Sequence, residues 1–246
     1  MLGFAVQLLM SPAHSILSFS RSANMAVDRA PLLFASELAK LKVVLASGSP
    51  RRAELLSRLG VSFVVEKSTF AEDHPKEGLT PAEYCLITAK TKANDVWTRL
   101  ITTTPDGVDL LIAADSIVAM EDGTILEKAE DPDAAKRMIQ QLSGSRHQVI
   151  TAIVLIARTN GAPLVMEHAE ITTVVFDTIS PEEVDAYVNV PEAWQGKAGA
   201  YGIQDLAASF IPRIEGDYYN VMGLPMNRLW TMIKATINSK ACARLQ

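Results

Sequence analysis

The chain has 246 residues, of which 48% are hydrophobic and 21% are charged, enough for one large α/β domain or two small ones. Its 23 Lys and Arg residues against 28 Asp and Glu residues give a net charge of −5, which argues against a general nucleic-acid-binding or membrane-surface protein. Cys85 and Cys242 are the two cysteines; they lack metal-ligand spacing, form no disulfide framework and indicate a reducing compartment. No apolar stretch approaches the roughly 18 residues of a membrane-spanning helix, so we expect a cytoplasmic protein.

Residues 1–40 differ from the rest and are expected to be an N-terminal extension to a domain over residues 41–240. Residues 1–36 are rich in Ser and have no acidic residue before Asp28. This composition faintly resembles an organelle-targeting peptide. The alternative is a disordered extension, with Met25 as a possible second start.

From Leu41 onward, apolar runs typical of strands alternate with capped helical segments. Thr80-Pro81-Ala82-Glu83 and Ser180-Pro181-Glu182-Glu183 are capping boxes, and Asp131-Pro132 opens another helix. The expected helices begin at Pro50 (closed by Gly60), Pro81, Pro132, Pro181 and Pro225, and the expected strands cover residues 41–47, 61–67, 109–120, 124–128, 147–157 and 163–179. One continuous α/β unit with a mixed sheet is the simplest arrangement.

The stretch "LASGSPRRAELL" (45–56) places two arginines where a helix disfavours cations. Ser49 is expected as the N-cap, so Arg51 and Arg52 lie in the first turn, at a cost of about 0.3–1 kcal/mol each from the helix dipole. A Gly/Ser turn entering a helix points N–H groups at an anion, and guanidinium groups suit phosphate oxygens. The alternative is that both side chains lie in solvent, one of them paired with Glu54.

Asp115 lies in the apolar run "LLIAADSIVAM", where an ionised carboxylate needs a partner. A two-residue turn at Asp122-Gly123 would place Ile117 opposite Lys128. Asp115 and Lys128 would then share one face, roughly 7–8 Å apart. They form either a buried salt bridge or a carboxylate and an ammonium that bind a metal–phosphate substrate.

Other polar residues give weaker signals. Lys92 lies at the inward margin of its expected helix and either extends to water or enters a site. Nothing in the local sequence distinguishes Glu72 from an ordinary acidic residue in a loop. The four histidines have no ligand spacing, and Ser47 and Ser49 have no nucleophile elbow around them.

Taken together, several stretches closely resemble the Maf family of nucleoside triphosphate pyrophosphatases. They are "LASGSPRRAELLSRLGVSF", "AKTKANDV", "AADSIV", "ILEKAEDPDAAKRMIQQLSGSRHQVIT", "GKAGAYGIQ" and "IEGDYYNVMGLP", and the resemblance spans about residues 41–235. It implies an elongated, two-lobed α/β fold with a long mixed β-sheet and a central cleft, similar to that of inosine triphosphatases. It also implies a homodimer.

The resemblance further implies a set of site residues. Asp115 would be the proton acceptor, acting with Glu72, Lys92 and Lys128, and Glu72 and Asp115 would hold a divalent metal such as Mg²⁺, Mn²⁺ or Co²⁺. The implied substrate-binding residues are Ser47, Arg51, Arg52, Ser116 and Gln204. Three positions depart from the family pattern: Ser116 replaces Thr, Ala129 replaces Pro, and "IQDLAAS" replaces a more glycine-rich run. None removes a charge from the implied site.

The implied reaction is hydrolysis of a nucleoside triphosphate to the monophosphate and pyrophosphate, cleansing the nucleotide pool. The branch that acts on 7-methyl-GTP has Trp in place of the first arginine, so Arg51 and Gln204 favour dTTP, UTP or modified pyrimidine nucleotides. The Gln204 amide offers both a donor and an acceptor to the imide edge of thymine or uracil. The alternatives are a nucleotide-binding regulator of cell division or septum formation without turnover, a 7-methyl-GTP pyrophosphatase, and a phosphatase that removes the terminal phosphate.

Overall fold

A seven-stranded mixed β-sheet runs along the molecule in the order β2-β1-β3-β5-β6-β7, with β4 paired to β3. The computed structural model describes residues 34–72, 74–104 and 107–239, so the expectations for residues 1–33 lie outside the described residues. The strands are β1 (Val43–Ala46), β2 (Phe63–Val65), β3 (Leu110–Met120), β4 (Ile125–Leu126), β5 (Arg146–Ala157), β6 (Leu164–Val175) and β7 (Arg213–Glu215). β1 is parallel to β2 and to β3, and the remaining pairs are antiparallel.

Four helices begin at the predicted residues Pro50, Pro81, Pro132 and Pro181, and the last begins at Met226, one residue after the expected Pro225. Thr80 and Ser180 form complete capping boxes, and Asp131 accepts a hydrogen bond from the N–H of Ala134 at 2.7 Å. The helices are α1 (Ala35–Leu38), α2 (Pro50–Arg58), α3 (Pro81–Thr103), α4 (Pro132–Leu142), α5 (Pro181–Val188), α6 (Pro191–Trp194), α7 (Tyr218–Met222) and α8 (Met226–Asn238), with a 3₁₀ turn η1 (Leu206–Phe210).

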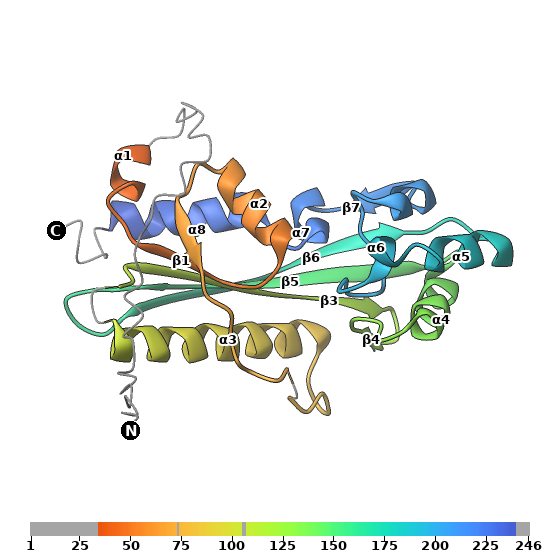
Figure 1. Cartoon of the computed structure of the whole chain (residues 1–246), viewed down its shortest axis with the longest axis horizontal. Helices are drawn as coiled ribbons and strands as arrows, with labels where there is room; N and C mark the ends of the chain where they lie inside the picture. Colours follow the sequence, from red (N-terminus) through yellow and green to blue (C-terminus); the bar gives the residue numbers. More distant parts are fainter. Residues whose placement is uncertain (1–33, 73, 105–106, 240–246) are drawn as a thin grey trace, which may run out of the picture.

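The long strands β3, β5 and β6 join two lobes, as the expected elongated fold requires (Figure 1). In the first lobe, α3 covers one face of the sheet, and α2 and α8 cover the other. In the second lobe, α4 and α5 pack beside the far ends of the strands. Each layer has its own apolar core, and Leu38 of α1 is buried in the core of the α2–α8 side.

The β3–β4 hairpin differs by one residue from the expected register. Val118 pairs with Leu126 and Ala119 with Ile125, and the N–H of Met120 donates to the carbonyl of Thr124 at 2.9 Å. The turn therefore has three residues, 121–123, and ends on Gly123 at φ 87°. The predicted pairing of Ile117 with Lys128 is therefore wrong: the register is shifted by one residue, and Lys128 lies beyond β4, where its backbone is bridged to Ala198.

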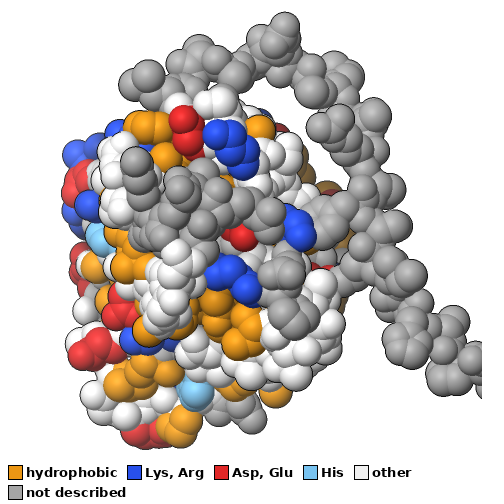
Figure 2. Space-filling model, turned by 90° about the vertical axis from the view of Figure 1, so that its left-hand side faces the viewer, with side chains coloured by type: hydrophobic (Ala, Val, Ile, Leu, Met, Phe, Trp, Pro, Cys, Tyr) orange, Lys and Arg blue, Asp and Glu red, His pale blue; other side chains and the backbone are white. Residues whose placement is uncertain are grey.

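The surface carries mixed charges. On the end of the molecule seen in Figure 2, Lys and Arg side chains lie among Asp, Glu and apolar side chains. Among the described residues, none of the helices is both long and apolar enough to span a membrane.

Candidate active site

A cleft of about 690 Å³ lies between the two lobes, a volume in the usual range for small-molecule sites of roughly 300–1,000 Å³. All nine sequence-predicted site residues line it: Ser47, Arg51, Arg52, Glu72, Lys92, Asp115, Ser116, Lys128 and Gln204. They come from the turn before α2, from α3, β3 and the segment after β4, and from two loops. The structure thus brings together residues that are more than 150 positions apart in the sequence.

The turn between β1 and α2 is shaped by hydroxyl groups. The Ser49 side chain caps α2 by accepting from the N–H of Arg52 at 3.5 Å, and the Ser47 hydroxyl accepts from the N–H of Ser49 at 3.2 Å. The Ser/Gly turn therefore leads directly into a helix N-terminus, the arrangement that favours an anion.

Arg52 is held by hydrogen bonds within the protein, whereas the sequence suggested a side chain that binds an anion or lies in solvent. Its Nε donates to Gly223 O at 2.9 Å, its Nη1 to Ser47 Oγ at 3.1 Å and Ala114 O at 2.9 Å, and its Nη2 to Ser116 Oγ at 2.8 Å. Four of its five N–H groups are thus engaged. Burial lowers the pKa of Arg52, and the charge of nearby Asp115 opposes this. Arg52 brings a fixed positive charge to the wall of the cleft.

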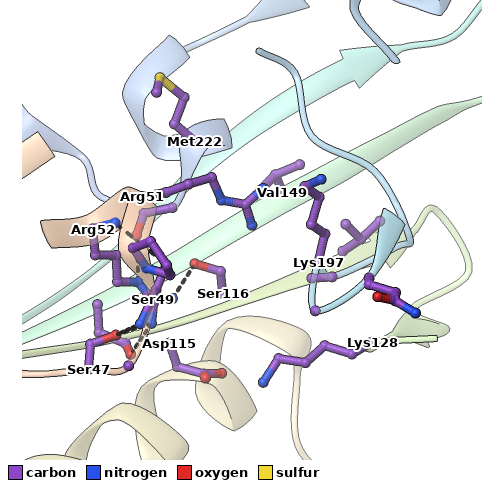
Figure 3. A pocket seen from close by; sticks show the side chains of 18 of the residues that line it. Ser47, Ser49, Arg51, Arg52, Asp115, Ser116, Lys128, Val149, Lys197 and Met222 are labelled. Atoms are coloured by element: carbon purple, nitrogen blue, oxygen red, sulfur yellow. Dashed lines mark hydrogen bonds between the residues drawn. The ribbon is translucent and has the colours of Figure 1, made fainter. Parts of the chain in front are cut away.

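Arg51 points in a different direction and crosses the cleft toward Val149 and Lys197 (Figure 3). Burial lowers its pKa, and the carboxylate of Asp205 opposes that shift. Glu54, the alternative partner considered for the arginines, instead forms an ion pair with Arg58 at 2.6 Å. The two neighbouring arginines therefore serve different parts of the cleft.

Asp115 has a partner that the hairpin argument did not identify. Its Oδ1 lies 2.6 Å from Nζ of Lys92 on α3, and both side chains are nine-tenths buried. The same ammonium reaches Oε1 of Glu72 at 2.9 Å. Lys92 thus points into the site, and one buried cation joins two carboxylates.

Lys128 reaches this group through Glu72, because its Nζ lies 3.7 Å from Glu72 Oε2. The backbone of Lys128 is bridged to Ala198, and this contact brings the glycine-rich loop 196–204 to the cleft. Figure 3 shows Lys128 extending toward Asp115 from the far side of the cleft. Lys128 therefore lies at the site, as predicted, but it is held there by Glu72 and not by a strand pairing opposite Ile117.

Glu72 is held in an unusual backbone conformation, with φ 60°. Such a conformation costs a residue other than Gly about 1–3 kcal/mol and persists where surrounding contacts impose it. Burial alone would raise the pKa of Glu72, but its hydrogen bond to Lys92 and the charges of Lys92, Lys128 and Arg52 outweigh burial and lower it. The carboxylate is therefore ionised at neutral pH.

A buried polar chain behind Ser116 was not predicted from the sequence. The Ser116 hydroxyl lies 2.8 Å from that of Thr151 on β5, and Thr151 donates to the Asn220 carbonyl at 3.0 Å. The Asn220 amide donates to Val149 O and Thr172 Oγ1. This chain fixes the hydroxyl that accepts from Arg52, and isolated polar residues in apolar strands give no sequence signal for it.

Lys197 and Asp205 form a second charged pair in the cleft, also missed from the sequence. The Lys197 Nζ lies 2.9 Å from Asp205 Oδ2, next to the exposed side chain of Gln204. Lys67 is a further cation of the lining: its stem covers Gly48, with Cε 2.9 Å from where a Cβ would lie. Six cationic side chains and four carboxylates line the cleft in the described residues, an excess suited to a polyanion.

The donor set fits a divalent metal whose coordination is completed by a ligand. Glu72 and Asp115 converge on the same point, where Lys92 Nζ now lies. No group of three or more His, Cys, Asp or Glu side chains suited to a metal occurs among the described residues. Mg²⁺ often takes only one or two protein carboxylates, with phosphate oxygens and water as its other ligands, so Glu72 and Asp115 could hold such an ion together with a phosphate ligand.

Comparisons with known proteins point to one family. Residues 42–236 match the family described as "Maf-like protein". A protein of Pyrococcus furiosus named "dTTP/UTP pyrophosphatase" is 42% identical over 185 residues, covering 75% of this chain and 90% of its own length. Proteins with the same name are 42% identical over 193 residues in Alkaliphilus oremlandii (78% and 95% covered) and 41% identical over 198 residues in Phocaeicola vulgatus (80% and 97% covered).

Proposed function

The chain belongs to the Maf family, and from this membership and the geometry of its cleft we propose that it hydrolyses dTTP and UTP to the nucleoside monophosphate and pyrophosphate. The observation that carries the proposal is the Asp115–Lys92–Glu72 group, a buried carboxylate held by an ammonium at the wall of a cation-rich cleft. Binding a nucleotide without turnover would not require a carboxylate placed among cations, so the geometry favours an enzyme.

In the reaction, water attacks the α-phosphorus, the bond to the bridging oxygen of the β-phosphate breaks, and pyrophosphate leaves. Asp115 accepts the proton of the attacking water. Lys92 fixes the Asp115 carboxylate by its 2.6 Å contact and adds positive charge beside the reacting phosphate. Glu72 holds Lys92 from the other side and, by pairing with Lys128, places a second ammonium at the same point.

The triphosphate lies along the cationic side of the cleft. The N–H groups of the turn 47–49 and the fixed charge of Arg52 bind phosphate oxygens. Lys67, which has no ion pair among the described residues, is free to neutralise further phosphate charge. The base lies toward Arg51 and Gln204.

A divalent metal would be held by Glu72 and Asp115 together with phosphate oxygens. When bound, such an ion neutralises phosphate charge and activates water. The homodimer implied by the family resemblance and the cytoplasmic location expected from the sequence stay predictions; sedimentation equilibrium and cell fractionation would test them.

The experiment is product analysis across a nucleotide panel of dTTP, UTP, dCTP, GTP and 7-methyl-GTP. We expect pyrophosphate and the monophosphate from dTTP and UTP. Their kcat/KM should be at least about tenfold above that for 7-methyl-GTP, a difference of about 1.4 kcal/mol in activation free energy. Release of orthophosphate would identify a phosphatase instead. Absence of turnover with nucleotide binding would support the regulator.

The matched variant for base choice is Arg51→Trp. It replaces the guanidinium by an aromatic ring that stacks on a cationic purine, so we expect it to lower the preference for dTTP over 7-methyl-GTP. A preference of the unmodified protein for 7-methyl-GTP would refute the substrate assignment and leave the chemistry unaffected.

A further inference from the structure

Lys197 is a buried ammonium that has no donor left for a substrate. Its Nζ donates to the carbonyls of Glu192 and Ala193 near the end of α6, the latter at 2.9 Å, and to Asp205 Oδ2 at 2.9 Å. An ammonium has three N–H groups, and all three are engaged. Lys197 therefore affects a bound ligand through the groups that it holds, chiefly the Asp205 carboxylate.

The Asp205 carboxylate and the Arg51 guanidinium converge on Gly202. A Cβ at Gly202 would lie 2.6 Å from Asp205 Oδ2 and 3.0 Å from Arg51 Nη1. The carboxylate precedes η1, whose Ala207 is buried in the core shared with α4 and α5. Arg51 extends from α2 across the cleft (Figure 3). The negative charge of Asp205 thus attracts Arg51 to one side of the cleft, and the bare backbone of Gly202 makes room for both groups.

The same carboxylate fixes the loop that carries Gln204. Ile203 is buried in the core beside α2 and α8, and the N–H of Asp205 closes a turn onto the Gly202 carbonyl at 3.0 Å. Gln204 is exposed between these two anchored neighbours and faces the cleft. Its backbone is therefore held on one side by core packing and on the other by the ion pair to Lys197.

We propose that Lys197 and Asp205 are positioning residues for base recognition, which hold Arg51 and Gln204 where they distinguish an imide base, thymine or uracil, from cytosine. The proposal rests on the proposed function and adds to it the device that sets base selectivity. Cytosine has an amino group and an unprotonated ring nitrogen where thymine has a carbonyl and an N–H. A rigidly placed amide therefore accepts one base and leaves unpaired groups with the other.

The test measures kcat and KM for dTTP and dCTP in Asp205→Asn, Lys197→Met and Gly202→Ala. Asp205→Asn removes the charge that holds Arg51, and Lys197→Met releases Asp205 from its anchor. Gly202→Ala keeps both charges but inserts a methyl group between them. We expect each variant to lower the dTTP:dCTP ratio of kcat/KM by about tenfold, mainly through KM, because misplaced recognition groups lose the discrimination that they gave. The kcat for dTTP should stay within about threefold, because the Asp115 group is untouched.

The matched controls are Lys136→Met and Asp185→Asn, which break a lysine–aspartate ion pair in the same lobe that does not line the cleft. They should leave the ratio unchanged. An unchanged ratio in folded Asp205→Asn, equal losses for both nucleotides, or failure of both Asp205→Asn and Lys197→Met to fold would overturn the proposal. Lack of pyrophosphate release by the unmodified protein would instead refute the proposed function.

Discussion

Replacing Asp115 by Asn keeps the shape of the side chain and removes its charge. Asn cannot accept the proton of the attacking water, so we expect a loss in kcat of about 10²–10⁴-fold, or about 2.7–5.5 kcal/mol of transition-state stabilisation. The fold should survive, because Lys92 keeps its second partner, Glu72, at 2.9 Å. The free energy of unfolding should therefore fall by less than the roughly 3–5 kcal/mol lost when a buried charge is left alone.

The assay is pyrophosphate release from dTTP, measured well below the melting temperature of the variant, with urea unfolding of the same sample. Asp185→Asn is the matched control, since it removes a carboxylate of the same kind that pairs with Lys136 outside the cleft lining. Turnover near that of the unmodified protein in folded Asp115→Asn would remove Asp115 from the chemistry and refute this reasoning.

Four further predictions follow from the same geometry. Excess chelator should abolish turnover, and Mg²⁺, Mn²⁺ or Co²⁺ should restore it; full activity in chelator would refute a metal role for the two cleft carboxylates. Lys67→Met should raise KM for dTTP by about threefold to tenfold with little change in kcat, as steady-state kinetics would report, because it removes one partly screened phosphate contact. Burial lowers the pKa of His147 from 6.5 to about 4. Between these two pH values the unfolded chain binds a proton at His147 and the folded protein does not. The folded state therefore loses stability as the pH falls from 6.5 toward 4. Urea unfolding should show about 2 kcal/mol less stability at pH 5 than at pH 7 from this residue, and His147→Gln should remove that slope. Arg52→Lys should lower the free energy of unfolding by about 2–4 kcal/mol, since it loses several of four internal hydrogen bonds, whereas Arg51→Lys should lower it by less than about 1 kcal/mol.

Local signals in the sequence predicted most of the fold. Each helix with a Ser, Thr or Asp cap followed by Pro begins where those residues indicate, because an N-cap depends on contacts within four residues. The hairpin after β3 was misjudged because Asp122-Gly123 suits both a two-residue turn and the end of a three-residue turn. The turn propensity of these two residues is compatible with both turns. The strand pairing of β3 with β4 in the folded sheet decides between them.

The site was only partly predictable for a related reason. The resemblance to the Maf family implied the nine cleft residues, but not the contacts among them. The pairing of Asp115 with Lys92 joins β3 to α3, and the chain from Ser116 through Thr151 to Asn220 joins three elements. Such contacts depend on the packing of a helix on a sheet and on strand register, neither of which leaves a periodic pattern in the sequence.

The two adjacent arginines have different roles in the cleft. Consecutive residues on a helix point about 100° apart, so the side chains of Arg51 and Arg52 leave α2 in different directions. Arg52 turns inward, where its hydrogen bonds to Ser47, Ala114, Ser116 and Gly223 offset the cost of a cation in the first helical turn. It links α2 to β3 and to the end of α7, so the residue that we propose to bring charge to the phosphates also fixes the cleft wall. Arg51 instead crosses the cleft, so its position depends on groups of the second lobe. In the proposed function, recognition of the base therefore requires the two lobes to be correctly placed, whereas the proposed chemistry at Asp115 depends on β3, α3 and the loop that carries Glu72.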